Sequence, residues 1–444
     1  MKSQERSANN GINIYIQNCE DMVRLLISED RDLFDKLSDN EQQRLKELNK
    51  LDKNSPYYNF LRAEIKMQWA MVKLKFGKEF AAITSGLNAY KLLKKNEENF
   101  PDFLPHRKTL GAAKVLLGAL PAKHRRYTSL VGLKGDVPEG LADIQSLIDS
   151  DSPFALEAKM AYFWLQTYVL GESKQAFENM QKLIKEHPDN LLLHISAAII
   201  ARNAGQSRAG YELLKRCPAG NDYVALHFLE YVKAELALQM GNYYASIAHG
   251  KAFIKNYKGE SYIKSSYYRL FLAYWFLEDS RAYSYLEKVK TAGKNLVIPD
   301  EYAEKFAQKE LPNRIITQAR IFTDGGELAK ASKLLNQLDP EQLPRKRDQL
   351  EYYYRKARLL HKKEQWYEAV LVYKQALSQT RKDSPYYFGA NTALQLGYIY
   401  RDQFSDNKSA MYYFNLAMEF EEHEYKGGID NKAKAALNRL RKKK

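Results

Sequence analysis

The chain has 444 residues, of which 45% are hydrophobic and 28% charged, and its formal net charge is +15. This apolar content excludes a generally disordered chain, and the length allows a large core or several domains. The 22 glycines and 13 prolines lie mostly between runs of periodic apolar residues, which favours an all-α protein. The positive charge permits nucleic acid, anionic membrane or acidic peptide partners but requires none of them, because lysines also solvate outer helix faces.

The cysteines and the apolar runs exclude further classes. Cys19 and Cys217 are far apart and in no CxxC spacing, so we expect neither a disulfide framework nor a metal knuckle. The polar residues 1–10 contain no signal-peptide core, and the apolar runs 191–201 and 270–277 are shorter than the roughly 20 residues that span a membrane. We therefore expect no transmembrane segment and a cytoplasmic protein. A bacterial periplasmic or cell-envelope location is the alternative if this is a mature form that has lost its signal peptide.

Helix signals begin near the N-terminus. Residues 1–52 form a predicted N-terminal helical segment, because apolar residues recur at helical spacing over 12–37. Residues 53–150 form a second predicted helical region. Its expected helices cover 56–76, 78–98, 108–120 and 138–149.

A serine followed by proline starts three of the expected helices. The serines are Ser55, Ser152 and Ser384, and each precedes an apolar-periodic run. Serine is a favoured N-cap and proline a favoured first helical residue. A capping serine commits its oxygen to backbone amides, so we predict that these three are not catalytic.

A glycine-rich turn interrupts the second region at Gly132, Gly135 and Asp136. It has neither a preceding strand nor the lysine–serine pair of a phosphate-binding loop. The sequence therefore predicts a tight turn packed between helices.

From residue 152 onward, small residues mark successive helical hairpins. The markers are Ala161, Ala197, Ala234, Ala273, Ala319, Ala357 and Gly397, which are 36 to 46 residues apart. In each hairpin the second helix repeats small and large apolar residues at offsets of four and three, which is one face of an α-helix. The two clearest hairpins lie within 350–420, where Ala357 precedes Ala369, Tyr373 and Ala376, and Gly397 precedes Ala410, Phe414 and Ala417.

These two hairpins resemble tetratricopeptide repeats (TPRs), whose period is about 34 residues. The resemblance implies an all-α, right-handed, TPR-like superhelical solenoid of antiparallel helix hairpins. We expect divergent hairpins over 151–290, an insertion or linker at 291–312, TPR hairpins over 313–423, and a capping helix with a basic tail at 424–444. In the central repeats, Glu230 and Arg269 stand where the pattern requires a large apolar residue.

The N-terminal third carries a narrower resemblance. Leu117 to Pro121 and the glycines Gly132, Gly135 and Gly140 are similar to a block of the tetratricopeptide repeat protein 39 family. The region around Trp69 and Gly77 resembles TPR proteins of the Bacteroidetes. Both resemblances imply a helical scaffold that binds proteins, and neither implies a catalytic residue.

No residue pattern predicts an enzyme. None of the eight histidines forms HExxH or a comparable ligand pair, and the acidic turn 421–424 is better explained as a solvated segment. No paired carboxylates or nucleophile–base set stands out. We therefore expect no catalytic residue, no metal and no cofactor.

Basic clusters occur at 123–126, 344–347 and 441–444, with Tyr127 after the first. Nucleic-acid binding needs such charge along one face, often beside stacking aromatic rings. Clusters so far apart in a solenoid need not share a face, so nucleic acid is an unfavoured partner.

The predicted partner-binding surface is the groove that the first helices of TPR hairpins line. If Ala319, Ala357 and Gly397 are equivalent, the groove residues recur immediately after each marker, one turn earlier and one turn later. The resulting set is Arg320, Tyr354, Arg358, His361, Tyr398 and Arg401. This mixed aromatic and cationic lining suits an extended peptide with acidic groups or a free carboxylate. It does not match the lysine–asparagine carboxylate clamp of chaperone-binding TPR domains.

The sequence thus predicts a non-catalytic helical-repeat scaffold that binds a protein or peptide in its concave groove. One alternative is an accessory subunit of a bacterial cell-envelope assembly. Another is a basic nucleic-acid-binding protein, for which strong salt dependence of binding would be expected. The oligomeric state and the identity of the partner do not follow from the sequence.

Overall fold

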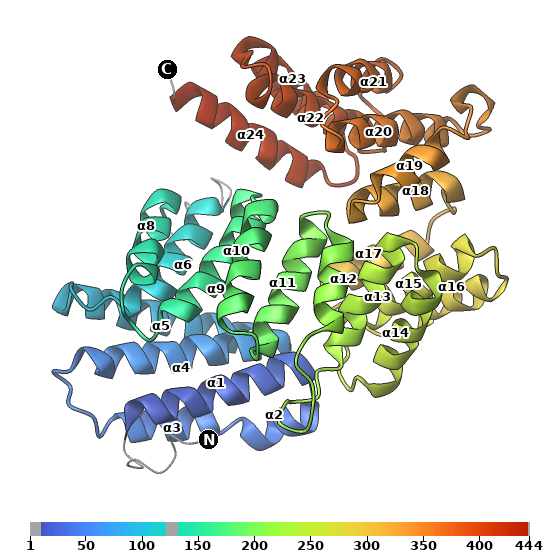
Figure 1. Ribbon diagram of the computed structural model, residues 1–444. Helices are drawn as coiled ribbons and strands as arrows, with labels where there is room; N and C mark the ends of the chain where they lie inside the picture. Colours follow the sequence, from blue (N-terminus) through green and yellow to red (C-terminus); the bar gives the residue numbers. More distant parts are fainter. Residues whose placement is uncertain (1–9, 121–131, 443–444) are drawn as a thin grey trace. The chain divides into compact units, whose positions relative to one another are not determined.

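The computed structural model describes residues 10–120 and 132–442, and all regular structure in this part of the chain is helical. The chain forms two compact units, which are described separately. Of the described residues, unit 1 contains 10–120, 132–236, 244–274 and 280–308, and unit 2 contains 237–243, 275–279 and 309–442. Within each unit consecutive helices pack as antiparallel hairpins, such as α4 with α5 and α22 with α23 (Figure 1). This is the all-α helical-repeat solenoid that the sequence predicts.

Unit 1 holds most of the helices. They are α1 (Gly11–Ser28), α2 (Arg31–Leu37), α3 (Asn40–Leu48), α4 (Pro56–Lys75), α5 (Glu79–Asn99), α6 (His106–Ala119), α8 (Val137–Ile148), α9 (Ala155–Leu165), the π-helical η1 (Gln166–Leu170), α10 (Ser173–Glu186), α11 (Leu191–Asn203), α12 (Ser207–Lys215), α13 (Phe228–Met240), α14 (Tyr243–Asn256), α15 (Ile263–Phe276), α16 (Arg281–Thr291) and α17 (Ile298–Ala307). The last residues of α13 and α15 count with unit 2.

Unit 2 contains the hairpins with the clearest repeat pattern. Its helices are α18 (Arg314–Gly325), α19 (Leu328–Leu335), the 3-10 turn η2 (Pro340–Gln342), α20 (Lys346–Lys362), α21 (Trp366–Ser378), α22 (Phe388–Asp402), α23 (Asn407–Glu419) and α24 (Lys426–Lys442). The first helices of its hairpins are α18, α20 and α22, and α24 packs against α22 and α23.

The three predicted helix-start serines all bind backbone amides. Ser55 caps α4 by accepting from the amide of Tyr57, with Pro56 as the first helical residue. Ser152 and Ser384 accept from the amides two residues later, and the helices α9 and α22 begin a few residues beyond them. The oxygens of these serines are therefore engaged structurally, as predicted.

The described part of the glycine-rich turn is a packing device. Asp136 caps α8 by accepting from the amide of Glu139, 2.9 Å away. A Cβ at Gly135 would lie 2.1 Å from the amide nitrogen of Gly118, and one at Gly140 would lie 2.5 Å from the carbonyl oxygen of Gly111. Real Cβ atoms do not approach backbone this closely, so the two glycines let α6 and α8 come together.

The hairpins of unit 2 close in the same way. Gly397 on α22 faces the ring of Phe414 on α23, and a Cβ there would lie 2.5 Å from that ring. In the preceding hairpin, Ala357, Ala369 and Tyr373 are completely buried in one apolar cluster. Ala357 and Gly397 therefore occupy positions where two helices approach closely.

The first helix of one hairpin in unit 1 differs from the sequence prediction. Ala161 marks this hairpin in the sequence, but Phe163 is the residue buried in the cluster with Ala176 and Met180 of α10. Trp164 is only half-buried and stacks on Tyr168 with ring centroids 5.4 Å apart. The helix continues into the π-helical η1, whose wider turn adds a residue that a 3.6-residue period does not anticipate.

The departure of Arg269 from the repeat pattern has an electrostatic explanation. Arg269 on α15 is 9% exposed, lies 2.9 Å from the carboxylate of Glu235 on α13, and stacks on Tyr231 with its guanidinium 4.2 Å from the ring centroid. Arg202 on α11 binds the same carboxylate at 2.8 Å. Burial alone would raise the pKa of Glu235, but the two arginines lower it to about 2. An ion triad thus joins three successive first helices where an apolar side chain was expected.

The predicted insertion at 291–312 contains a helix. Asp300 in the first turn of α17 accepts hydrogen bonds from the amides of Tyr262 and Ser265, at 2.6 and 2.8 Å. These two residues begin α15, so the segment is fastened to a hairpin within unit 1. None of the helices in the described ranges is long and apolar enough to cross a membrane.

The ion triad leads to a stability prediction. We expect Glu235→Gln to lower the free energy of unfolding by about 3–5 kcal/mol, because the buried Arg269 and the half-buried Arg202 lose their anion. Urea denaturation and native-state hydrogen exchange of α13 would measure this. The control Glu287→Gln removes a carboxylate whose side chain is 64% exposed and should cost no more than about 1 kcal/mol. Equal effects of the two changes would contradict the prediction.

The same pair of proteins should differ in pH dependence. The pKa of Glu235 falls from 4.5 to about 2 on folding, so its contribution is present above pH 4.5 and is lost as the pH falls toward 2. The stability difference between wild type and Glu235→Gln should therefore narrow over that range. A difference independent of pH would show that the carboxylate charge is not what stabilises the triad.

Hairpin closure can be tested with two glycines. Gly397→Ala should destabilise unit 2 by about 1–3 kcal/mol, because the added methyl collides with Phe414. Gly427→Ala is the matched control, since a Cβ there meets nothing within 4 Å and alanine favours the helix. Thermal denaturation should show a lower Tm for the first variant and an unchanged or higher Tm for the second. A tolerated Gly397→Ala would mean that the hairpin does not need this close approach.

Candidate functional site

The first helices α20 and α22 in unit 2 are joined by three side-chain hydrogen bonds. Arg355 donates to the hydroxyl of Tyr387 at 2.8 Å, and Asn391 donates to the hydroxyl of Tyr354 at 2.6 Å. Arg358 donates to the amide oxygen of Gln395 at 2.9 Å. On each helix these residues recur every three or four positions, so they lie along one face. We call this row the polar ladder.

A buried carboxylate lies at one end of the polar ladder. Glu351 is 4% exposed and binds Arg355 at 2.9 Å and Arg347 at 3.2 Å. Burial alone would raise its pKa, but Arg355, Arg347 and Arg320 together lower it below the usual value. Arg320 extends from α18, so charges from two first helices converge on Glu351.

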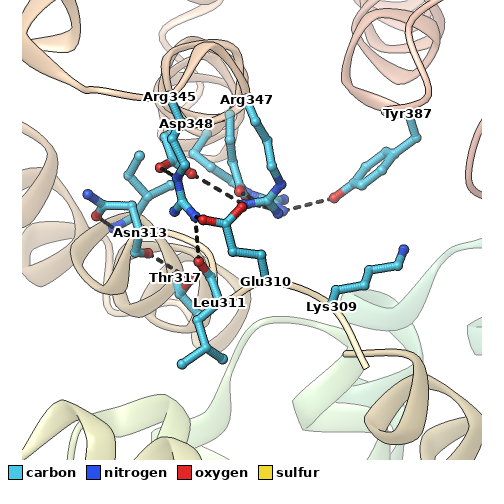
Figure 2. Close-up of polar contacts among 12 residues, drawn as sticks. Lys309, Glu310, Leu311, Asn313, Thr317, Arg345, Arg347, Asp348 and Tyr387 are labelled. Carbon is cyan, nitrogen blue, oxygen red and sulfur yellow. Dashed lines mark hydrogen bonds and ion pairs between the residues drawn. The ribbon is translucent and has the colours of Figure 1, made fainter. Parts of the chain in front are cut away.

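A second set of ion pairs adjoins this one (Figure 2). Arg345 binds Asp348 at 2.6 Å and Glu310 at 2.5 Å, and it donates to the carbonyl oxygen of Leu311 at 2.9 Å. Arg347 reaches Asp348 at 3.2 Å as well as Glu351. The segment that enters α18 is thereby tied to the start of α20. The charge of Arg345 is neutralised by its two carboxylate partners.

The arginines and carboxylates around the polar ladder give this first-helix face of unit 2 a positive net charge, and we call it the cationic face. Four arginines surround the ladder, namely Arg320, Arg347, Arg355 and Arg358. Glu351 is the buried carboxylate among them, and Asp324 is an exposed one that acts on Arg358. With Arg345, Glu310 and Asp348 included, five positive and four negative charges leave an excess of one. Such a surface attracts carboxylates or other anions, because guanidinium groups bind them through paired hydrogen bonds.

The structure brings together three of the six predicted groove residues. Arg320 and Arg358 are both half-buried and belong to the cationic face. Tyr354 belongs to the polar ladder but is 2% exposed, so its ring lies beneath the surface and only supports the ladder. Its neighbours at equivalent positions, Ile316 and Leu394, are likewise buried. Direct contact with a partner therefore rests on the two arginines.

His361 lies against its own second helix. Its Nδ1 is 3.3 Å from the hydroxyl of Tyr373, and its ring packs edge-on to Trp366 and Tyr373. Burial, together with Arg358 and Lys362, lowers the pKa of His361 to about 4. The imidazole is therefore neutral near pH 7 and adds no charge to the face.

Tyr398 and Arg401 pair with each other at the far end of α22. The guanidinium of Arg401 is 5.1 Å from the ring centroid of Tyr398, and the ring packs edge-on against Phe414. Arg401 also binds Asp402 at 2.6 Å, which offsets its charge. Both are half-buried and adjoin α23. Within the described ranges, no hydrogen bond or ion pair joins them to the polar ladder.

The sequence analysis missed the residues that organise the face. Glu351 and Arg355 are four positions apart on α20, and Arg358 follows three positions later. Such an acidic–basic pair at helical spacing is visible in the sequence. It lies outside the three positions of each first helix that the TPR register assigns to the groove. The amides Asn391 and Gln395 carried no signal of their own.

The basic clusters offer little support for nucleic-acid binding. In the cluster at 344–347, Arg345 and Arg347 pair with Asp348, Glu310 and Glu351, whereas Lys346 is exposed and binds two glutamines. The cluster at 123–126 lies outside the described residues, as do the side chains of 441–444. Among the described residues no group of three His, Cys, Asp or Glu side chains could hold a metal ion.

Comparison with known proteins gives weak structural similarity. No family model matches the chain, and no curated protein matches it. A tetratricopeptide repeat protein from Parabacteroides merdae is 16% identical, covers 64% of this chain and 99% of its own, and has a TM-score of 0.27. The P58(IPK) TPR domain is 16% identical, with coverage of 96% and 97% and a TM-score of 0.24.

Yeast Tom70 is 14% identical, with coverage of 95% and 97% and a TM-score of 0.26. Similarity this low assigns no partner or function to the chain. The resemblance to the tetratricopeptide repeat protein 39 family stays a prediction.

The protonation state of the His361 imidazole can be measured. Its imidazole should titrate near pH 4 instead of its ordinary 6.5, because burial and two neighbouring cations oppose protonation. The unfolded chain takes up this proton at higher pH, so stability should fall as the pH drops from 6.5 toward 4. Nitrogen-15 NMR of the histidine rings would follow the titration, with exposed His187 as the internal control. A His361 midpoint near 6.5 would contradict the packing described above.

Proposed function

We propose that this protein is a non-catalytic helical-repeat scaffold that binds an acidic segment of a protein partner on the first-helix face of unit 2. The observation that carries the proposal is the excess of guanidinium groups around Glu351 and the polar ladder. Arg320 and Arg358 would contact the partner directly. Tyr398 and Arg401 would extend the surface along α22 without adding net charge.

The chemistry of the face favours a peptide over a small ion. Arg358 is held by Gln395, and Gln395 is in turn 3.5 Å from Asn391, so amide and guanidinium groups alternate along α22 and α20. Guanidinium groups bind carboxylates, and side-chain amides can bind the backbone of an extended peptide. Because the ladder already fixes these side chains, binding loses less conformational entropy than it would with free arginines.

A permanent subunit of a cell-envelope assembly would use the same surface. The two possibilities differ in the lifetime of the complex and not in the residues that form it. A nucleic-acid ligand is disfavoured, because the face carries a small excess of positive charge and Arg345 and Arg347 are already ion-paired. The salt dependence of binding, and competition between an oligonucleotide and an acidic peptide, distinguish a nucleic-acid ligand from a protein segment.

The proposal can be tested by reversing charge on the face. We expect Arg320→Glu/Arg358→Glu to weaken binding of a fluorescent glutamate–aspartate decapeptide about tenfold or more, since each charge-assisted hydrogen bond is worth about 1.5–3 kcal/mol. The matched control is Lys333→Glu/Lys363→Glu, which changes the net charge equally at exposed positions. Arg358→Gln is a milder variant that keeps a hydrogen-bonding side chain. Circular dichroism would confirm that each variant is folded.

The same variants should be used to capture partners from the native host. A protein that wild type and the lysine control retain, and that the arginine variant loses, would identify the partner. Equal retention by all three would refute the proposed face. Tighter binding of a single-stranded oligonucleotide than of the acidic decapeptide would instead favour nucleic acid.

A further inference from the structure

Unit 1 contains a cavity of about 610 Å³ that is unrelated to the face on unit 2. It lies where the end of α1 meets the α10–α11 turn and the loop between α12 and α13. Its lining includes Ile27, Glu186, Asp189, Leu191, Asp222 and Val224. The volume is within the range of about 300–1,000 Å³ for ligand-binding cavities.

The floor of the cavity is apolar. Ile27 packs against Leu191 and Leu226, which are each less than 10% exposed. Val224 lies at the edge of the cavity and is 51% exposed, which is high for an apolar side chain. A large apolar side chain entering the cavity would cover Val224 and the floor together, and this burial would favour binding.

The rim of the cavity is acidic. Glu186, Asp189 and Asp222 line it, and no lysine or arginine does. Among the residues that the structure describes, these three carboxylates form no ion pair. The contrast with the whole chain, whose net charge is +15, makes this concentration of negative charge notable. A cationic ligand would be complementary to the rim.

The N-terminus of α11 beside the cavity does not reverse the preference for a cationic ligand. The N-terminus of α11 could in principle attract an anion through its free amides. The side chain of Asn190, however, already accepts from the amides of Leu192 and Leu193, at 3.1 and 3.3 Å. The capped helix end therefore leaves the carboxylates as the dominant charges.

The walls are fastened before any ligand arrives. The hydroxyl of Tyr223 donates to the carbonyl oxygen of Asp189 at 3.2 Å, which joins the two loops. Just beyond Ile27, the carboxylate of Glu29 binds Lys75 and Tyr257, each at 2.7 Å, and also Ser261. These contacts hold the end of α1 and so fix the floor. A preformed cavity lowers the entropy that binding must overcome.

We propose that this cavity binds a segment of a protein partner in which a large apolar side chain is flanked by lysine or arginine. The apolar side chain enters the cavity and contacts Ile27, Leu191 and Val224. The flanking cations pair with Asp189, Asp222 and Glu186 at the rim. The site is distinct from the cationic face of unit 2, which would repel such a segment.

Three labelled hexapeptides test this specificity by fluorescence anisotropy on the full chain. The first alternates leucine with arginine, the second leucine with glutamate, and the third serine with arginine. We expect the leucine–arginine peptide to bind about tenfold more tightly than either of the others. Only this peptide has both an apolar side chain for the floor of the cavity and cations for its acidic rim. Its affinity should fall as the salt concentration rises, since salt screens the exposed rim charges.

Two variants locate the binding in the cavity. Asp189→Asn/Asp222→Asn should weaken the leucine–arginine peptide about fivefold or more, because two ion pairs are lost while the turns keep residues that suit them. Val224→Ser should weaken it as well, and its exposure makes misfolding no concern. The control Glu47→Gln/Glu98→Gln removes two exposed carboxylates elsewhere in unit 1 and should leave the affinity unchanged.

Each other outcome overturns the proposal. If the leucine–glutamate peptide bound as tightly as the leucine–arginine peptide, the rim charges would not contribute to binding. If the serine–arginine peptide bound as tightly, the apolar floor would not contribute. Loss of affinity in the Glu47→Gln/Glu98→Gln control would indicate general attraction to the surface. The variants Arg320→Glu and Arg358→Glu should not affect this peptide, so the result is independent of the function proposed for unit 2.

Discussion

The fold depends on how closely the two helices of each hairpin approach. A residue with little or no side chain must face a buried ring or aliphatic group, as Gly397 faces Phe414. Once a hairpin is closed, its first helix lies beside the first helix of the next hairpin in the same unit. That placement puts Arg358 within hydrogen-bonding distance of Gln395, and Tyr354 within that of Asn391. The polar ladder is thus a consequence of hairpin packing.

Buried and half-buried ions join neighbouring hairpins. Glu235 is held by Arg202 and Arg269 in unit 1, and Glu351 is held by Arg347 and Arg355 in unit 2. Removing such groups from water costs energy that the pairing must offset, so buried ion pairs are weak evidence for added stability. They do penalise any other register, because a shifted hairpin would leave a buried charge without its partner. Charged residues at positions where the repeat pattern has apolar ones therefore still allow the hairpins to stack in one register.

The two units offer partners different chemistry. The first-helix face of unit 2 combines surplus guanidinium groups with amides, whereas the cavity of unit 1 combines an apolar floor with carboxylates. Charge complementarity mainly determines which partner binds and how fast, while apolar burial supplies much of the affinity. A scaffold with both surfaces could hold an acidic segment on one unit and a cationic, apolar segment on the other. Each surface is formed by residues of a single unit and can be studied alone.

The sequence by itself determined the all-α helical-repeat class, the capping role of Ser55 and the tight packing at Gly135 and Gly397. These features depend on local periodicity, capping and side-chain size, which are written in neighbouring residues. Only the tertiary structure decided which polar residues meet. It placed Arg269 against Glu235, buried Tyr354, and turned His361 toward Tyr373. It also formed the cavity from segments about 200 residues apart in the chain, around Ile27 and Leu226. Such contacts depend on how successive helices are oriented, and a small change in helical register, as at η1, moves a side chain from one face to another.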